Sequence, residues 1–137
     1  MPKFGTQSKD KLETCHIKIQ AIMNEVIRHI DISVIFGKRG KLEQNVLVKE
    51  GRSKLKYPLS LHNSEPSRAI DIMLWNKVKP RFRWNDIKQM QFVAGYVRAT
   101  ADSMGIKLRC GCDWNSDMVN DESFYDGSHF ELHKRED

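Results

Sequence analysis

Three side chains of this 137-residue chain are of types that bind metal ions, and they stand in unusual places. Asp71 lies inside the apolar run AIDIML, where burial of a lone carboxylate is costly. His62 precedes it by nine residues, and His129 opens the apolar segment HFEL near the C-terminal end. Two imidazoles and one carboxylate form a ligand set of catalytic zinc sites, which keep one position open for water. A cation would offset the burial of Asp71, although a solvated sheet face explains Asp71 alone equally well.

A second group of potential metal ligands lies in the acidic segment DWNSDMVNDE. Asp113, Asn115 and Asp117 alternate as at the start of a calcium-binding loop. Met118 occupies the position where such a loop has glycine, and Phe124 the position where it has glutamate. A Ca²⁺ site at the three alternating residues therefore competes with a solvated acidic loop, which these departures favour.

The remaining cysteines and histidines offer weaker alternatives. Three cysteines (Cys15, Cys110 and Cys112) are an odd number, unlike a disulfide framework, so we expect free thiols. The lone C-x-C pair has too few thiolates for a zinc site, and packing on a strand explains it better. His133 could replace His129 as a ligand, but it stands close to the C-terminal end, where chains fray, so we prefer His129.

The charge of the chain favours an anionic partner. Lysine and arginine number 23 against 18 aspartate and glutamate, so the net charge is +5. Nucleic acid and a bacterial envelope rich in carboxylates and phosphates both fit that excess. No apolar run approaches the roughly 20 residues of a membrane-spanning helix, and the segment MPKFGTQSKDKLETC lacks the apolar stretch of a secretory signal. We therefore expect no membrane span and synthesis in the cytosol.

Periodicity and turn residues predict the elements that position these side chains. Apolar residues at three- and four-residue spacing predict helices, and short β-branched runs predict strands. We expect helices at residues 9–30, 41–50 and 86–104, and strands at residues 32–36, 69–74, 106–110 and 129–133. Strands separated by helices and loops are typical of one α+β domain of this size. On these strands Asp71 faces away from its apolar neighbours, and Glu131 shares a face with His129.

Four segments, taken in order, resemble a known family. They are SLHNSEPSRAIDI, RWND, GIKLRCGCDWNSD and SFYDGSHFEL. Together they resemble the zinc peptidases of the VanY-type D-Ala-D-Ala carboxypeptidase group, and most of all its small phage endolysins, the L-alanyl-D-glutamate endopeptidases. The likeness extends from about Phe36 to Leu132. The segment NSEPSRAI, between the first histidine and the aspartate, is longer than in the family's commonest form.

The resemblance implies a ligand set for one zinc ion and a catalytic base. The Ser-x-His segment that begins at Ser60 supplies His62, and the Ala-x-Asp segment supplies Asp71. The Asp-x-x-His segment supplies His129 as the third ligand and Asp126 as the base. Zinc would leave its fourth position to a water of lowered pKa. Asp126 would take the proton of that water and pass it to the leaving amine.

The same resemblance suggests roles for five further residues. Arg39 matches an arginine near the substrate carbonyl or carboxylate, although an exposed turn arginine is the simpler interpretation of the sequence alone. Gln44 would shape the cleft or lie on an ordinary helix surface. Glu131 would orient a ligand imidazole or contact substrate. Trp114 would form a wall of the cleft or belong to the core, and Ser60 would support the ligands or the substrate.

The resemblance also implies the fold and the biological setting. It implies an α+β fold of the Hedgehog/DD-peptidase type, with a small, mainly antiparallel sheet packed with helices. Residues 1–137 would be a single zinc peptidase domain without a separate wall-binding domain. The chain would be a phage endolysin made in the host cytoplasm, reaching the wall after another phage protein permeabilises the membrane. Its partner would be bacterial peptidoglycan, cut at the L-alanyl-D-glutamate bond, and we expect a monomer and no nucleic-acid partner.

Two alternatives stay open. A D-Ala-D-Ala carboxypeptidase of the same family would use a similar site to remove terminal D-Ala. A basic wall- or nucleic-acid-binding module without catalysis would belong to a different class. The cations available to it are Lys38, Arg39, Lys41, Arg52, Lys54 and Lys56. They are not interleaved with a stacking aromatic platform, and that module leaves the histidines and aspartates without a role, so we favour the peptidase.

Overall fold

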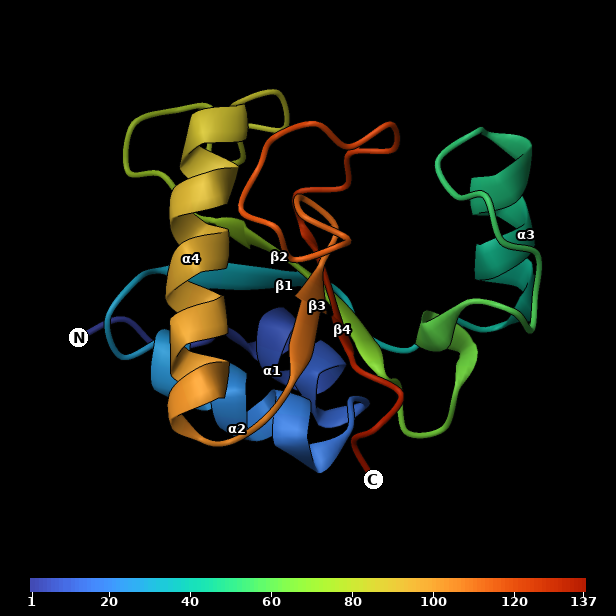
Figure 1. Cartoon of the computed structure of the whole chain (residues 1–137), viewed down its shortest axis with the longest axis horizontal. Helices are drawn as coiled ribbons and strands as arrows, with labels where there is room; N and C mark the ends of the chain where they lie inside the picture. Colours follow the sequence, from blue (N-terminus) through green and yellow to red (C-terminus); the bar gives the residue numbers. More distant parts are fainter.

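A four-stranded sheet forms the centre of the molecule in the computed structural model, which describes residues 1–137 (Figure 1). Along the chain the elements are α1 (Thr6–Glu13), α2 (Ile17–Val26), β1 (Ile32–Phe36), α3 (Lys41–Lys49), the 3₁₀ helix η1 (Leu61–Asn63), β2 (Ala69–Leu74), α4 (Ile87–Ser103), β3 (Leu108–Cys110) and β4 (His129–Leu132). The strands lie in the order β1-β2-β4-β3, and each neighbouring pair is antiparallel. The expected α+β fold with a small antiparallel sheet is confirmed.

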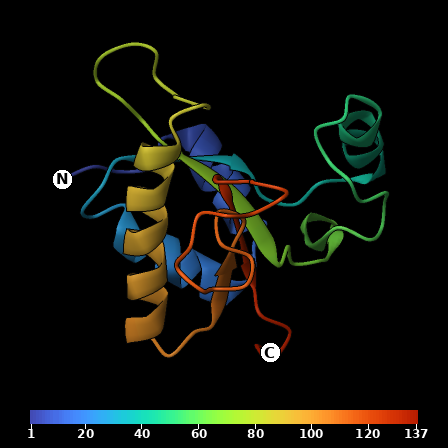
Figure 2. The same cartoon turned by 45° about the horizontal axis from the view of Figure 1, so that its top comes forward.

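The two faces of the sheet serve different purposes. Helices α2 and α4 lie on one side of the sheet, and α3 stands on the other side (Figure 2). Ile70, Ile72 and Phe130 belong to the hydrophobic core, together with residues of α1, α2 and α4. Because side chains alternate along a strand, Asp71 and His129 point to the opposite face, away from that core.

The helix expected at residues 9–30 is in fact two helices, α1 and α2, so the prediction of one continuous helix was wrong. At the break the backbone bonds to a distant segment instead of continuing the helix. The N–H of His16 donates to the carbonyl of Ser67 at 2.8 Å, and the N–H of Ser67 donates to the carbonyl of Thr14 at 2.9 Å. Both helices bury apolar residues in the same core, so the apolar spacing continues across the break.

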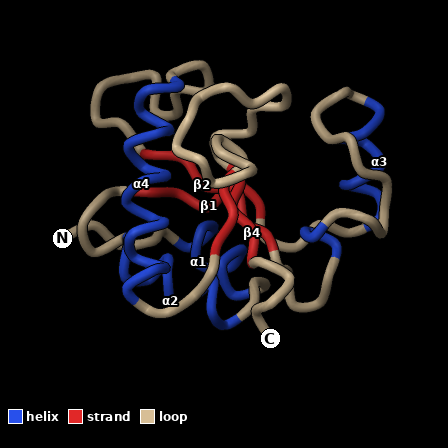
Figure 3. Tube along the Cα trace, viewed as in Figure 1, coloured by secondary structure: helices blue, strands red, loops and turns tan.

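The other expected elements are present, with small changes at their ends (Figure 3). The strand expected at residues 106–110 is shorter, because only Leu108 to Cys110 pair with β4. All three cysteines lie in the hydrophobic core. None of the helices combines the length and the apolar character that crossing a membrane requires.

The core face of β4 provides a test of this division of the sheet. Phe130 is fully buried between two residues that face the other way, so Phe130→Ala should lower the free energy of unfolding by about 3–5 kcal/mol. Phe92 is 82% exposed on α4, and Phe92→Ala should change it by less than about 0.5 kcal/mol. Chemical denaturation followed by circular dichroism measures both, and equal losses would contradict the assignment of Phe130 to the core.

Candidate functional site

His62, Asp71 and His129 converge on one point above the outer face of the sheet. The Nε2 atom of His62 lies 3.3 Å from Nδ1 of His129, and Oδ1 of Asp71 lies 3.5 Å and 3.2 Å from these two nitrogens. Ligands about 2.0–2.1 Å from a tetrahedral ion such as zinc lie roughly 3.3–3.4 Å from one another. The three side chains, called the trio below, therefore have the spacing of three corners of a tetrahedral metal site.

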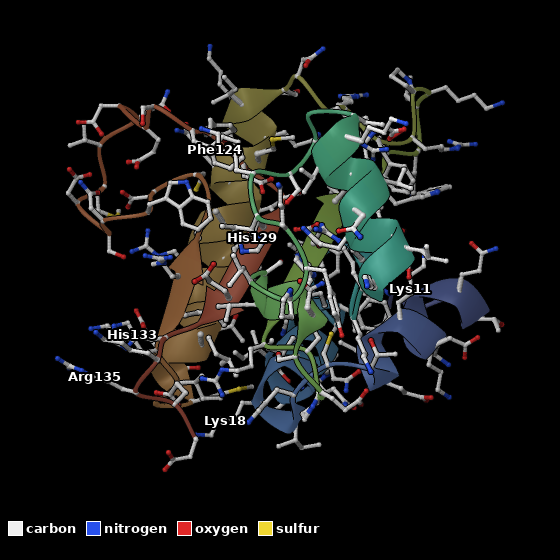
Figure 4. All side chains as sticks on the ribbon, turned by 90° about the vertical axis from the view of Figure 1, so that its right-hand side faces the viewer. Lys11, Lys18, Phe124, His129, His133 and Arg135 are labelled. Atoms are coloured by element: carbon white, nitrogen blue, oxygen red, sulfur yellow. The ribbon has the colours of Figure 1, made fainter.

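The sheet register brings two members of the trio together. Asp71 on β2 is the direct cross-strand partner of His129 on β4. Directly opposed residues of an antiparallel pair have side chains on the same face and close together, so these two ligands need no loop to place them. Figure 4 shows His129 in the middle of the molecule, with His133 and Arg135 at the left edge of the molecule. His133 is not part of the trio.

His62 comes from the short helix η1, which is tied at both ends. The Ser60 hydroxyl accepts the N–H of His62 at 3.2 Å, and the Asn63 side chain accepts the N–H of Ser60 at 3.1 Å. The N–H of Arg39 donates to the carbonyl of His62 at 2.7 Å, and the Asn63 amide donates to the carbonyl of Arg39. The longer segment between His62 and Asp71 therefore does not keep these side chains apart.

Each imidazole is oriented by a partner on its outer nitrogen. Nδ1 of His62 lies 2.7 Å from the carbonyl oxygen of Gly37, and Nε2 of His129 lies 2.9 Å from a carboxylate oxygen of Glu131. A side chain at Gly37 would collide with the backbone of α1, since its Cβ would lie 2.3 Å from the carbonyl oxygen of Lys11. Such partners fix the ring of a metal-binding histidine and leave its inner nitrogen free to bind.

Arg39 is the partner that the buried carboxylate of Asp71 requires. Its Nη2 donates to Oδ2 of Asp71 at 2.7 Å, on the side away from the histidines. The side chain is almost fully buried and stacks on Phe36, so the interpretation as an exposed turn arginine was wrong. Its turn is hydrogen-bonded to η1, and a local sequence pattern could not reveal that contact.

Gln44 is also fully buried, so the interpretation as a helix-surface residue was wrong as well. Its oxygen accepts from Nη1 of Arg39 at 3.3 Å, and its amide donates to the Ser53 hydroxyl and to the carbonyl of Leu55. A glutamine at this position accepts a hydrogen bond from the guanidinium of Arg39 and fixes the loop that follows α3 by donating to it. Gln44 therefore supports the site through Arg39.

The contacts within the trio shift the pKa values of Asp71 and His129 in opposite directions. Burial alone would raise the pKa of Asp71, but hydrogen bonds with His129 and His62 outweigh burial and hold it far below its ordinary range. Burial opposes a charge on His129 too, yet its hydrogen bonds with Asp71 and Glu131 raise its pKa to about 9. Asp71 is therefore anionic at physiological pH, and the site attracts positive charge, either as a proton on His129 or as a metal ion.

Asp126 lies beside the trio and is held by its backbone. Its N–H donates to the carbonyl of Gly111 at 2.9 Å, and its own carbonyl accepts from the N–H of His129 at 3.1 Å. A side chain at Gly111 would collide with Asp126, because its Cβ would lie 2.2 Å from the Asp126 carbonyl oxygen. Burial, with the charge of Asp71, raises the pKa of Asp126. A carboxyl group of raised pKa next to a metal site is suited to proton transfer.

A cavity of about 420 Å³ gives access to this group of residues. Asp71, Asp126 and Arg39 all line it, so the carboxylates and the arginine face a common space. Sequence reasoning missed other residues of its wall, among them Trp84, Tyr125, Met90 and Arg52. The segment RWND was part of the family likeness, and it was the signal that could have pointed to Trp84.

Trp114 lies beside His129 and outside the hydrophobic core, with ring centroids 5.4 Å apart. It stacks on Phe124, and its indole N–H donates to the Phe124 carbonyl at 2.6 Å. Trp114 also lines a second cavity of about 800 Å³, together with Glu131 and with the cations Arg68, Lys107 and Arg109.

The acidic segment forms a loop whose carboxylates bind the loop itself. Asp113, Asp117 and Glu122 lie together, whereas Asn115 hydrogen-bonds to Asp117. The oxygens of Asp113 accept from backbone N–H groups of the loop and from Arg98. These hydrogen bonds hold the loop in its conformation without requiring an ion, so calcium binding stays a prediction.

The contact between Glu131 and His129 leads to a test of metal binding. Removing the partner that orients a ligand histidine commonly lowers metal affinity about 10- to 100-fold, which we expect of Glu131→Ala. Arg109 is the other partner of Glu131, at 3.0 Å, and Arg109→Ala is the matched control that leaves the contact with His129 in place. Competition with a chelating dye measures zinc affinity, and equal losses in both variants would show that Glu131 does not act through His129.

Known proteins resemble this chain in sequence and in fold. The family model described as phage L-alanyl-D-glutamate peptidase matches residues 1–133. The L-alanyl-D-glutamate peptidase of Escherichia phage T5 is 30% identical over 136 residues, which cover 95% of this chain and 97% of that protein. The crystal structure of the L-Ala D-Glu endopeptidase ChiX of Serratia marcescens superposes with a TM-score of 0.74 at 22% identity, covering 96% of this chain and 90% of that chain. By sequence and by fold, therefore, this chain belongs to the phage L-alanyl-D-glutamate peptidase family.

Proposed function

We propose that this chain is a zinc-dependent endopeptidase that hydrolyses the bond between L-alanine and D-glutamate in the stem peptides of bacterial peptidoglycan. Its family, and the name of its relative from phage T5, support the choice of bond. The observation that carries the proposal is one cavity that is lined both by Asp126 and by Asp71 of the trio.

Zinc is the proposed ion of the trio. Two imidazole nitrogens and one carboxylate oxygen suit zinc, whereas calcium and magnesium prefer oxygen ligands alone. Gly37 and Glu131 engage the outer nitrogens and leave the inner nitrogens of both histidines as donors. Bound zinc would lower the pKa of a water in its fourth position and polarise the peptide carbonyl.

Two residues of the chain carry the proposed chemistry. Asp126 accepts a proton from the attacking water and later donates it to the leaving amine, as base and then as acid. Burial and the charge of Asp71 raise its pKa, which favours that exchange. Arg39 holds Asp71 in place and brings positive charge to the cavity wall, where the oxygen of the attacked carbonyl becomes negative.

Four residues have proposed supporting roles. Glu131 and Ser60 orient the ligand histidines, the first through the His129 ring and the second through the turn that carries His62. Gln44 fixes the guanidinium of Arg39. Trp114 forms the wall beside His129 that faces the second cavity.

The proposed setting is the bacterial cell wall during phage-induced lysis. The net charge of +5 attracts the chain to a wall rich in carboxylates. We propose that residues 1–137 act as one monomeric peptidase domain, made in the host cytoplasm and released to the wall through membrane lesions.

The alternatives have less support. A D-Ala-D-Ala carboxypeptidase could use the same trio, but the matching family and the relative from phage T5 are named for the L-alanyl-D-glutamate bond. A wall- or nucleic-acid-binding module without catalysis would leave Asp126 and the trio without a role.

The products of digestion distinguish the two bonds. Purified peptidoglycan incubated with the zinc-loaded protein should release stem peptides with a new D-glutamate amino end, and a chelator should stop the release. Mass spectrometry of the released fragments measures this. Loss of D-Ala alone would assign the chain to the carboxypeptidases, and no release with zinc present would indicate a binding module.

Substitution of the base and of a ligand should separate catalysis from metal binding. Asp126→Ala should retain zinc and lower peptide release about 10²- to 10⁴-fold, the usual contribution of a general base. His129→Ala should lose both zinc and activity. Asp102→Ala, which removes an exposed carboxylate of α4, is the control. Zinc content by atomic absorption and release rates are the measurements, and full zinc content in His129→Ala would contradict the ligand assignment.

A further inference from the structure

The segment between β2 and α4, residues 75–86, is a loop with an unusual set of side chains. Its sequence WNKVKPRFRWND contains four cations and three aromatic rings, and its one acidic residue caps α4. None of the four cations takes part in an ion pair. Lys77, Val78 and Lys79 are exposed at its tip. Uncompensated charge next to exposed apolar surface is typical of a binding surface.

This basic loop has a defined conformation held by its own contacts. Asn76 is buried, and its amide donates to the carbonyl of Arg81 at 2.9 Å, while its oxygen accepts from Gln89 on α4 at 2.8 Å. The guanidinium of Arg81 stacks on Trp75 at 4.5 Å. In Figure 1 the loop lies at the top left, around the start of α4. A loop fixed in this way presents its exposed side chains without a large entropy cost on binding.

Trp84 connects the basic loop to the catalytic cavity. Trp84 is 51% exposed as a residue, its ring lies near Phe82 with centroids 6.4 Å apart, and it lines the same cavity as Asp71 and Asp126. Trp114, beside His129, is less available to a ligand than Trp84. Its indole N–H is hydrogen-bonded, and its faces are covered by Phe124 and Arg109. Trp84 therefore offers an open indole face at the edge of the catalytic cavity.

We propose that the basic loop, with Trp84 at its end next to the cavity, is a subsite for the glycan strand of peptidoglycan. This inference rests on the proposed function. L-Alanine is the residue that joins the stem peptide to the sugar, so the glycan lies only about 3.5 Å of chain beyond the alanine next to the cleaved bond. An open indole face stacks on the apolar face of a sugar ring. Lys77 and Lys79 complement the carboxylates of neighbouring stem peptides.

The subsite predicts that the enzyme distinguishes polymer from free peptide through Trp84. Trp84→Ala should lower release from intact peptidoglycan about tenfold, the effect of one lost stacking contact. On the free stem peptides that an amidase releases from the same peptidoglycan, the same variant should lose clearly less of its rate, because these peptides lack the sugar that Trp84 contacts. Trp84→Phe should restore most of the rate on polymer. Phe92→Ala, which removes an exposed aromatic ring outside the cavity, is the matched control.

A second measurement does not depend on catalysis. The amidase also leaves glycan strands without stem peptides. Once these strands are immobilised on beads, the wild-type protein and Phe92→Ala should bind to them, whereas Trp84→Ala should not. On intact peptidoglycan, a Lys77→Ser/Lys79→Ser variant should show weaker binding and a smaller response to salt than the wild type or Lys9→Ser.

Each outcome decides between distinct conclusions. Equal loss of activity on polymer and on free peptide would assign Trp84 to the cavity wall alone and overturn the subsite. Unchanged activity and binding of Trp84→Ala on polymer would overturn the subsite too. So would a result in which these variants keep their binding to peptidoglycan and lose only binding to phosphatidylglycerol vesicles or to DNA. A wild-type protein that contains zinc and cleaves neither substrate would instead overturn the proposed function.

Discussion

The buried carboxylate of Asp71 is the interaction on which the rest of the site depends. A lone ionised carboxylate away from water is too costly to persist, so the fold must bring it positive or hydrogen-bonding partners. Oδ1 faces His62 and His129, and Oδ2 accepts from Arg39. These partners come from η1, from β4 and from the turn before α3, segments far apart in the sequence. The partners that stabilise this one carboxylate thus bring together several segments on the outer face of the sheet. The same negative charge makes this place suitable for a cation.

The alternation of the strands separates this polar site from the core. Along β4, His129 and Glu131 point to the site while Phe130 and Leu132 point to the core. The apolar face stabilises the sheet by burial, and the polar face uses the sheet as a rigid base for its ligands. Because Asp71 and His129 are directly opposed across the two central strands, the distance between these two proposed ligands depends on sheet register and not on a loop.

The catalytic cavity differs in this respect, because loops build much of its wall. Asp126 is held through the backbone of Gly111, and Trp84 through the packed loop before α4. Two of the three proposed metal ligands stand on strands, and the groups that surround them stand largely on loops. This division suits a metalloenzyme, because the ion needs fixed geometry while the substrate side needs shape and charge matched to a polymer. The two halves of the site are close in space but rest on different parts of the fold.

The sequence by itself determined the fold class, the strands and the group of side chains that forms the trio. Period-two alternation placed Asp71 opposite its apolar neighbours and Glu131 beside His129, because strand geometry is a local property. The tertiary structure alone decided the break between α1 and α2, since contacts of the backbone with Ser67 replaced helical hydrogen bonds there. It also decided the burial of Arg39 and Gln44 and the place of Trp84 in the cavity. These depend on contacts between segments that lie close only after folding, such as the ion pair of Arg39 with Asp71, 32 residues away, and no local pattern encodes them.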